Sequence, residues 1–150
     1  MKFEIPRPMK EEHEELHNNL TRAIQAGGAV GKAAQGVADA LHAHFESEEA
    51  FALPPLGLLP SLADGNVTPD MAEVFRMTDT LKAELPKMLA EHGTIVGALK
   101  QLIAAAEQEN KPEHVKFAHA LMLHAQTEEQ VSYPTAILIG EYLKLKLGKN

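Results

Sequence analysis

One short motif occurs twice in this chain of 150 residues, and the repeat restricts the fold more than any other feature. The stretch "LHAHFESEEAFALPP" covers residues 41–55, and "LMLHAQTEEQVSYPT" covers residues 121–135. The aligned pairs are His44 with His124, Glu48 with Glu128, Glu49 with Glu129, and Pro54 with Pro134. Because only 8 of the 150 residues are histidines, this alignment indicates two halves built to the same pattern.

The repeat extends beyond this motif. Glu12 and His13 near the start of the chain match Glu91 and His92 in its second half. Each half therefore contains a histidine and, about thirty residues later, the pattern His-x-x-x-Glu.

Prolines and glycines divide the rest of the chain into helical segments, and no run of five or more residues alternates as a strand would. We expect long helices over residues 8–26, 29–53, 68–109 and 111–132, with Thr68 as an N-cap. Pro86 should kink or divide the third helix. Pro134 should kink the fourth or begin a short last helix ending near residue 147. Four long segments with mostly short links predict one all-α domain over residues 1–150, an up-down-up-down four-helix bundle.

Composition narrows the functional classes. The chain has no cysteine, which excludes a disulfide framework, a thiolate metal site and a cysteine nucleophile. A formal charge of −7 argues against a nucleic-acid partner and against an anionic membrane surface. The first ten residues lack the apolar region of a secretory signal, and the longest apolar run is interrupted by prolines. We therefore expect a cytoplasmic protein.

The repeated residues have the spacing of a metal site. Four residues advance a helix by about 400°, so His44 and Glu48 share one face, as do His124 and Glu128. Burying four imidazoles and two carboxylates without partners would be prohibitive, whereas metal ions would satisfy them. Six such groups are too many for one tetrahedral zinc, but they suit two metals bridged by both glutamates.

These motifs resemble the hemerythrin-like HHE cation-binding family. The matching segments are "EEHEEL" at residues 11–16, "HFESEE" at 44–49, "EHGTI" at 91–95, and "HAQTEE" at 124–129, followed by Tyr133-Pro134. The resemblance covers residues 8–134 and implies a four-helix bundle around a non-haem di-iron centre. The ligands implied by position are His13, His44, Glu48, His92, His124 and Glu128.

The chain departs from the oxygen-carrying hemerythrins at two positions. They have a second histidine four residues after the one in the third helix, where this chain has Val96. They also have an aspartate five residues after the histidine of the fourth helix, where this chain has Glu129, so Glu128 and Glu129 both remain candidates. The internal repeat favours Glu128. The four-His, two-Glu set is closer to the di-iron domain of iron–sulfur cluster repair proteins, although their cysteine-containing N-terminal domain is absent.

Several other residues are assigned secondary roles. Glu12, Glu49, Glu91 and Glu129 could supply hydrogen bonds to the ligand histidines. His17 is an alternative ligand or a partly exposed neighbour of the site. His42 should face away from His44, and His114 and His119 have no counterparts in the first half, so we predict that none of the three is a ligand.

The resulting hypothesis is a protein with two non-haem irons, for which Zn or Mn could substitute. It would bind or sense O₂ or NO, or handle intracellular iron, and it is not expected to be an enzyme. One alternative is a di-iron oxidoreductase that consumes peroxide or NO, or an iron–sulfur cluster repair factor. The other is a helical interaction module with a structural metal. The C-terminal residues 141–150 are a candidate contact in a homodimer.

Overall fold

A computed structural model describes residues 1–148, and all its regular secondary structure is helical. Four long helices dominate: α1 (Arg7–Gln25), α2 (Gly28–Ser47), α4 (Phe75–Gln108) and α5 (Pro112–Thr127). The shorter elements are η1 (Glu48–Ala52), η2 (Pro54–Leu58), α3 (Leu59–Ala63), η3 (Pro69–Val74), η4 (Glu128–Ser132) and α6 (Tyr133–Lys146).

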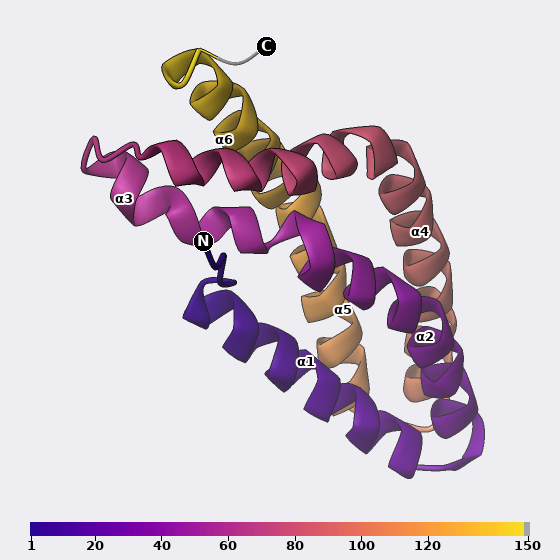
Figure 1. Cartoon of the computed structure of the whole chain (residues 1–150). Coiled ribbons are helices and arrows are strands. Elements are labelled where there is room, and N and C mark those ends of the chain that lie inside the picture. Colours follow the sequence, from indigo (N-terminus) through magenta and orange to yellow (C-terminus); the bar gives the residue numbers. More distant parts are fainter. Residues whose placement is uncertain (149–150) are drawn as a thin grey trace.

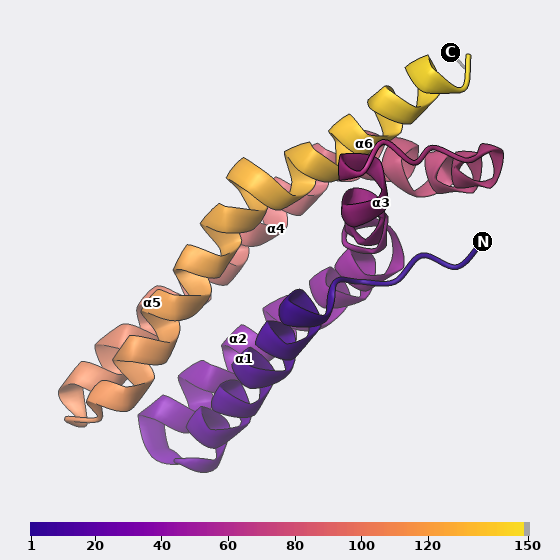
Figure 2. The same cartoon turned by 90° about the vertical axis from the view of Figure 1, so that its left-hand side faces the viewer.

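The four long helices contact one another in a ring, α1 with α2, α2 with α4, α4 with α5, and α5 with α1. Figure 1 shows α1 and α2 side by side, and the turned view in Figure 2 shows α4 and α5 as the second pair. Within residues 1–148 the fold is therefore all-helical and consistent with a four-helix bundle.

Local sequence explains where several helices begin and end. Gly27 and Gly28 separate α1 from α2, and their φ angles of +69° and +60° are readily adopted only by glycine. Proline occupies the first turn of α1 and α5, where its missing N–H costs nothing. Pro86 lies inside α4 without dividing it, and α4 bends along its course (Figure 1).

Three expected boundaries are corrected. The second helix was expected to stay regular to residue 53, but it becomes a π-helix at Glu48; the fourth changes in the same way at Glu128. Thr68 precedes the third helical region as expected, but its hydroxyl pairs with Asp70 instead of capping the helix, and the first turn is a 3₁₀ helix.

The switch from α-helix to π-helix at Glu48 and at Glu128 has a common cause. Each π-helical segment ends just before a proline, Pro54 or Pro134, which lacks the N–H that a continuing α-helix would use. Leu53 instead donates its backbone N–H to the Glu48 carbonyl at 2.9 Å, and Tyr133 donates to the Glu128 carbonyl. Figure 2 shows α5, η4 and α6 continuing as one helical rod.

Two apolar clusters fill the molecule. One contains Leu41, Ile95 and Leu121, together with other residues of α1, α2, α4 and α5. The other contains Met88 and Tyr133, along with residues of η1, η2, η3 and α6. Along α4, Met88 belongs to one cluster and Ile95 to the other. The histidine between them, His92, therefore lies in a polar layer sandwiched between the two cores.

None of the helices formed by residues 1–148 is both long enough and apolar enough to span a membrane. The short last helix expected to end near residue 147 is α6, which ends at Lys146 and has Lys144 and Lys146 in its last turn, near the negative pole of the helix. Lys149 and Asn150, the last residues of the candidate dimer contact, lie outside the described residues.

Candidate metal centre

The six predicted ligands lie together in the polar layer, each from a different element. They are His13 of α1, His44 of α2, Glu48 of η1, His92 of α4, His124 of α5 and Glu128 of η4. None is more than 8% exposed. Their donor atoms form two groups, each with its atoms within 4.8 Å of one another. We call His44 and His92 the inner half, and His13 and His124 the outer half; Glu48 and Glu128 belong to both.

The two glutamates divide their oxygens between the halves. In the inner half, the Oε1 atoms of Glu48 and Glu128 lie 2.6 Å from His44 Nε2 and 3.3 Å from His92 Nε2, respectively. In the outer half, the corresponding Oε2 atoms lie 3.3 Å from His13 Nε2 and 3.2 Å from His124 Nε2. Each carboxylate thus faces both halves, the arrangement needed to bridge two metal ions.

The imidazole rings are oriented by a second layer of carboxylates. Glu91 Oε1 lies 3.2 Å from His44 Nδ1, and Glu129 Oε1 lies 2.9 Å from His92 Nδ1. Glu12 pairs with Nδ1 of His124 in the same way. A proton on Nδ1 of each ring leaves the Nε2 lone pair directed at the centre, which is the usual orientation of metal-binding histidines.

This geometry separates the two glutamates that the sequence left open. Glu128 lies in both groups of donor atoms, whereas the neighbouring Glu129 is exposed and contacts the far side of the His92 ring. Glu12, Glu91 and Glu129 contact histidine rings as expected. Glu49 was expected to do the same, but within the described residues it only lines the same pockets as His13.

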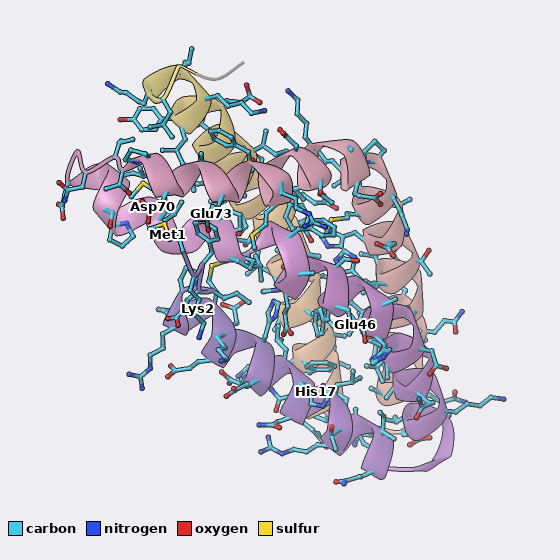
Figure 3. The ribbon with its side chains drawn as sticks, viewed as in Figure 1. Met1, Lys2, His17, Glu46, Asp70 and Glu73 are labelled. Atoms are coloured by element: carbon cyan, nitrogen blue, oxygen red, sulfur yellow. The ribbon has the colours of Figure 1, made fainter. Side chains whose placement is uncertain are left out.

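The remaining histidines lie outside the two groups. His17 is exposed on the surface of α1 (Figure 3), where it lines a pocket beside His13. His42 is exposed and pairs with Glu46, as expected for a side chain facing away from the centre. His119 is exposed, and the buried His114 lies beside Glu113.

The electrostatics of the cluster are those of a cation-binding site. Burial lowers the pKa of His92, but hydrogen bonds to Glu128, Glu48 and Glu129 outweigh that effect and raise the pKa to about 10. For His124, burial likewise lowers the pKa, but Glu128 and Glu12 raise it to about 9. Burial raises the pKa of Glu128, yet the neighbouring imidazoles of His124, His13 and His92 hold it well below its ordinary value.

Two buried carboxylate oxygens show whether a metal ion would fit the site. Glu48 Oε2 and Glu128 Oε2 are shielded from solvent and have no hydrogen-bond partner. Leaving a charged oxygen unsatisfied in this way is costly, and a metal ion between these oxygens and the outer-half imidazoles would satisfy both. The residues present therefore fit a metal at this position.

Sequence reasoning missed one residue of the site. Tyr133 was noted only as part of the Tyr-Pro pair, but its hydroxyl lies in the inner half and donates a 2.8 Å hydrogen bond to Glu48 Oε1. The available signal was the proline that follows it, because that proline accompanies the π-helix which turns residue 133 inward.

Comparison with known proteins finds no match among family models, curated proteins or solved structures. The function is therefore inferred from the site itself.

Proposed function

We propose that this protein is a hemerythrin-like metal-binding protein that holds two non-haem irons in an up-down-up-down helical bundle. The observation that carries the proposal is the division of Glu48 and Glu128, whose Oε1 atoms face one histidine pair while their Oε2 atoms face the other. A single ion would require only one oxygen from each carboxylate. Two ions would use both oxygens and all four Nε2 atoms.

The donor set favours iron among the common metals. Each half offers two imidazole nitrogens and two carboxylate oxygens, a mixture that suits Fe and, as substitutes, Mn or Zn. Bound iron would supply redox chemistry and affinity for O₂ or NO. The chain's own contribution is to fix the imidazoles through Glu12, Glu91 and Glu129, and to keep bulk water away from the centre.

We propose that the biological role is binding or sensing of O₂ or NO, or the handling of iron within the cytoplasm. The pockets beside His13 have volumes of about 520 and 320 Å³ and open to solvent, so a diatomic molecule has access to the outer half.

Metal analysis of protein purified without added metal tests the proposal, together with a near-ultraviolet spectrum. We expect about two irons per chain in the wild type and in His42→Ala, which alters an exposed histidine. His124→Ala and His92→Ala, one from each half, should lower the metal content. Protein that contains no metal and takes up none from Fe(II), Mn(II) or Zn(II) would overturn the proposal. Two zinc or manganese ions would retain the site and reject iron.

Stopped-flow mixing of the reduced, loaded protein with O₂, NO or peroxide distinguishes binding from catalysis. One ligand bound per centre with no further consumption supports a binding or sensing role. Repeated consumption in the presence of a reductant would favour the oxidoreductase alternative.

A further inference from the structure

The two halves of the centre differ by one hydroxyl group. Tyr133 is fully buried, and its oxygen lies 3.2 Å from His44 Nε2 and 3.2 Å from His92 Nε2. The same oxygen lies 2.8 Å from Glu48 Oε1 and 3.5 Å from Glu128 Oε1. It therefore contacts all four donor atoms of the inner half.

These distances are those between neighbouring ligands around one metal ion. With metal–ligand bonds of about 2.1 Å, adjacent positions of an octahedron are about 3.0 Å apart. The phenolic oxygen is separated from the four donors by 2.8 to 3.5 Å. It thus stands where a fifth protein ligand would stand, over the face formed by the other four.

The π-helix explains why this side chain reaches the centre. In a regular α-helix, five residues turn by about 500°, which would place Tyr133 about 140° around the axis from Glu128. The i to i+5 hydrogen bond of η4 instead brings residue 133 close to the direction of residue 128. Pro134 follows immediately, so the position of Tyr133 is built into the backbone.

Among residues 1–148, no equivalent group lies in the outer half. The internal repeat pairs Tyr133 with Leu53, which directly follows the matching π-helix η1 and is fully buried. Its side chain carries no polar atom. The carboxylate oxygens directed at the outer half, Glu48 Oε2 and Glu128 Oε2, are also the ones without a hydrogen-bond partner.

Solvent access follows the same asymmetry. His13 lines two open pockets together with Glu49. A third pocket reaches His92 on the face between α4 and α5, but Glu129, which lines that pocket, already contacts the ring through Nδ1. The outer half is therefore the side from which an external molecule reaches the centre.

We propose that the phenolic oxygen of Tyr133 is a fifth protein ligand to the inner-half metal, so that only the outer-half metal takes an external small ligand. The inference rests on the proposed di-metal function. On metal binding, the hydroxyl hydrogen bond to Glu48 is replaced by an oxygen–metal bond, and the phenol proton passes to solvent. The external ligand is a diatomic molecule or a small anion that reaches the outer-half metal from the pockets beside His13.

Spectroscopy of the air-oxidised, iron-loaded protein tests the proposal directly. We expect a visible phenolate-to-Fe(III) absorption band, with tyrosinate ring modes in the resonance Raman spectrum excited within it. The chain has only two tyrosines, so Tyr142→Phe is the matched control and should keep the band. Tyr133→Phe should lose it while retaining two metals per chain.

Two further measurements complement the spectra, and the first depends on neither iron redox chemistry nor the variant. Adding Zn(II) to the metal-free wild type should give the ultraviolet difference spectrum of one ionised tyrosine per chain. Titration of the ferric protein with azide should saturate at one azide per chain in the wild type, rising to two in Tyr133→Phe.

The outcomes separate this inference from the proposed function. Two bound metals without any tyrosinate signal in the wild type would overturn the role of Tyr133 and leave the metal centre intact. Binding of two azides per wild-type chain would overturn the proposal that only the outer-half metal takes an external ligand. Failure of the wild type to bind metal would overturn both. If Tyr133→Phe does not fold, the wild type and Tyr142→Phe still decide the question.

Discussion

Metal loading should release protons, and the structure sets how many. In the metal-free protein, the acidic groups around His92 and His124 raise their pKa values to about 10 and about 9. Both rings therefore carry a second proton at pH 7. An Nε2 atom that binds a metal cannot keep its proton, so filling both halves must displace at least two protons per chain.

The size of the pH effect follows from this count. Each displaced proton changes the free energy of loading by about 1.4 kcal/mol per pH unit. The two imidazole protons alone make the overall loading constant rise about 100-fold per pH unit below the pKa of His124, and release of the Tyr133 phenol proton would add about tenfold more.

The assay is titration of Zn(II) into metal-free protein by isothermal calorimetry between pH 6.5 and 8. Repeating each titration in two buffers with different ionisation enthalpies gives the number of protons released. His42→Ala removes an exposed histidine that pairs only with Glu46, and it should release as many protons as the wild type.

Glu129→Gln provides a second comparison. It removes one of the groups that raise the pKa of His92, so fewer protons should be released near pH 8 than in the wild type. A wild-type count near zero across this range would refute the reasoning, because it would mean that the metal-free cluster holds its histidines neutral.

Three further predictions concern stability and ligand identity. The raised pKa values of His92 and His124 stabilise the metal-free fold. This contribution is fully present below the unfolded pKa of 6.5 and is lost as pH rises through 9 to 10. Calorimetry should therefore show that the melting temperature of the metal-free protein falls over that window, more steeply than that of the zinc-loaded form. Glu128→Gln should reduce metal content below two per chain, whereas Glu129→Gln should keep two metals and weaken affinity about 10- to 100-fold in chelator competition. Gly57→Ala would put a Cβ into the Glu4 carbonyl oxygen and should cost about 1–3 kcal/mol in urea unfolding, whereas Gly93→Ala, with nothing within 4 Å, should be neutral or stabilising.

The repeat in the sequence was enough to name the residues that meet at the centre. A ligand pair separated by four residues must share a helical face, so His44 with Glu48, and His124 with Glu128, needed no tertiary information. The duplication then favoured Glu128 over Glu129, and the structure places Glu128 in the cluster. That these residues bind metal remains a prediction.

The sequence predicted helix boundaries less accurately than it predicted the residues of the centre. Proline and glycine marked most ends within a few residues because they remove a donor or permit a positive φ. The π-helical segments at Glu48 and Glu128 were not foreseen, since a one-residue change in hydrogen bonding leaves almost no trace in hydrophobic periodicity.

The sequence by itself determined an all-helical chain and the identity of six converging polar side chains, because both follow from local spacing and its duplication. Only the tertiary structure decided which oxygen of each glutamate faces which histidine pair, since that depends on how four helices pack around the layer. It also decided that Tyr133 reaches one half while Leu53 leaves the other without a hydroxyl. The sequence specifies which residue types are present, whereas the direction of a buried side chain depends on the backbone and neighbours that enclose it.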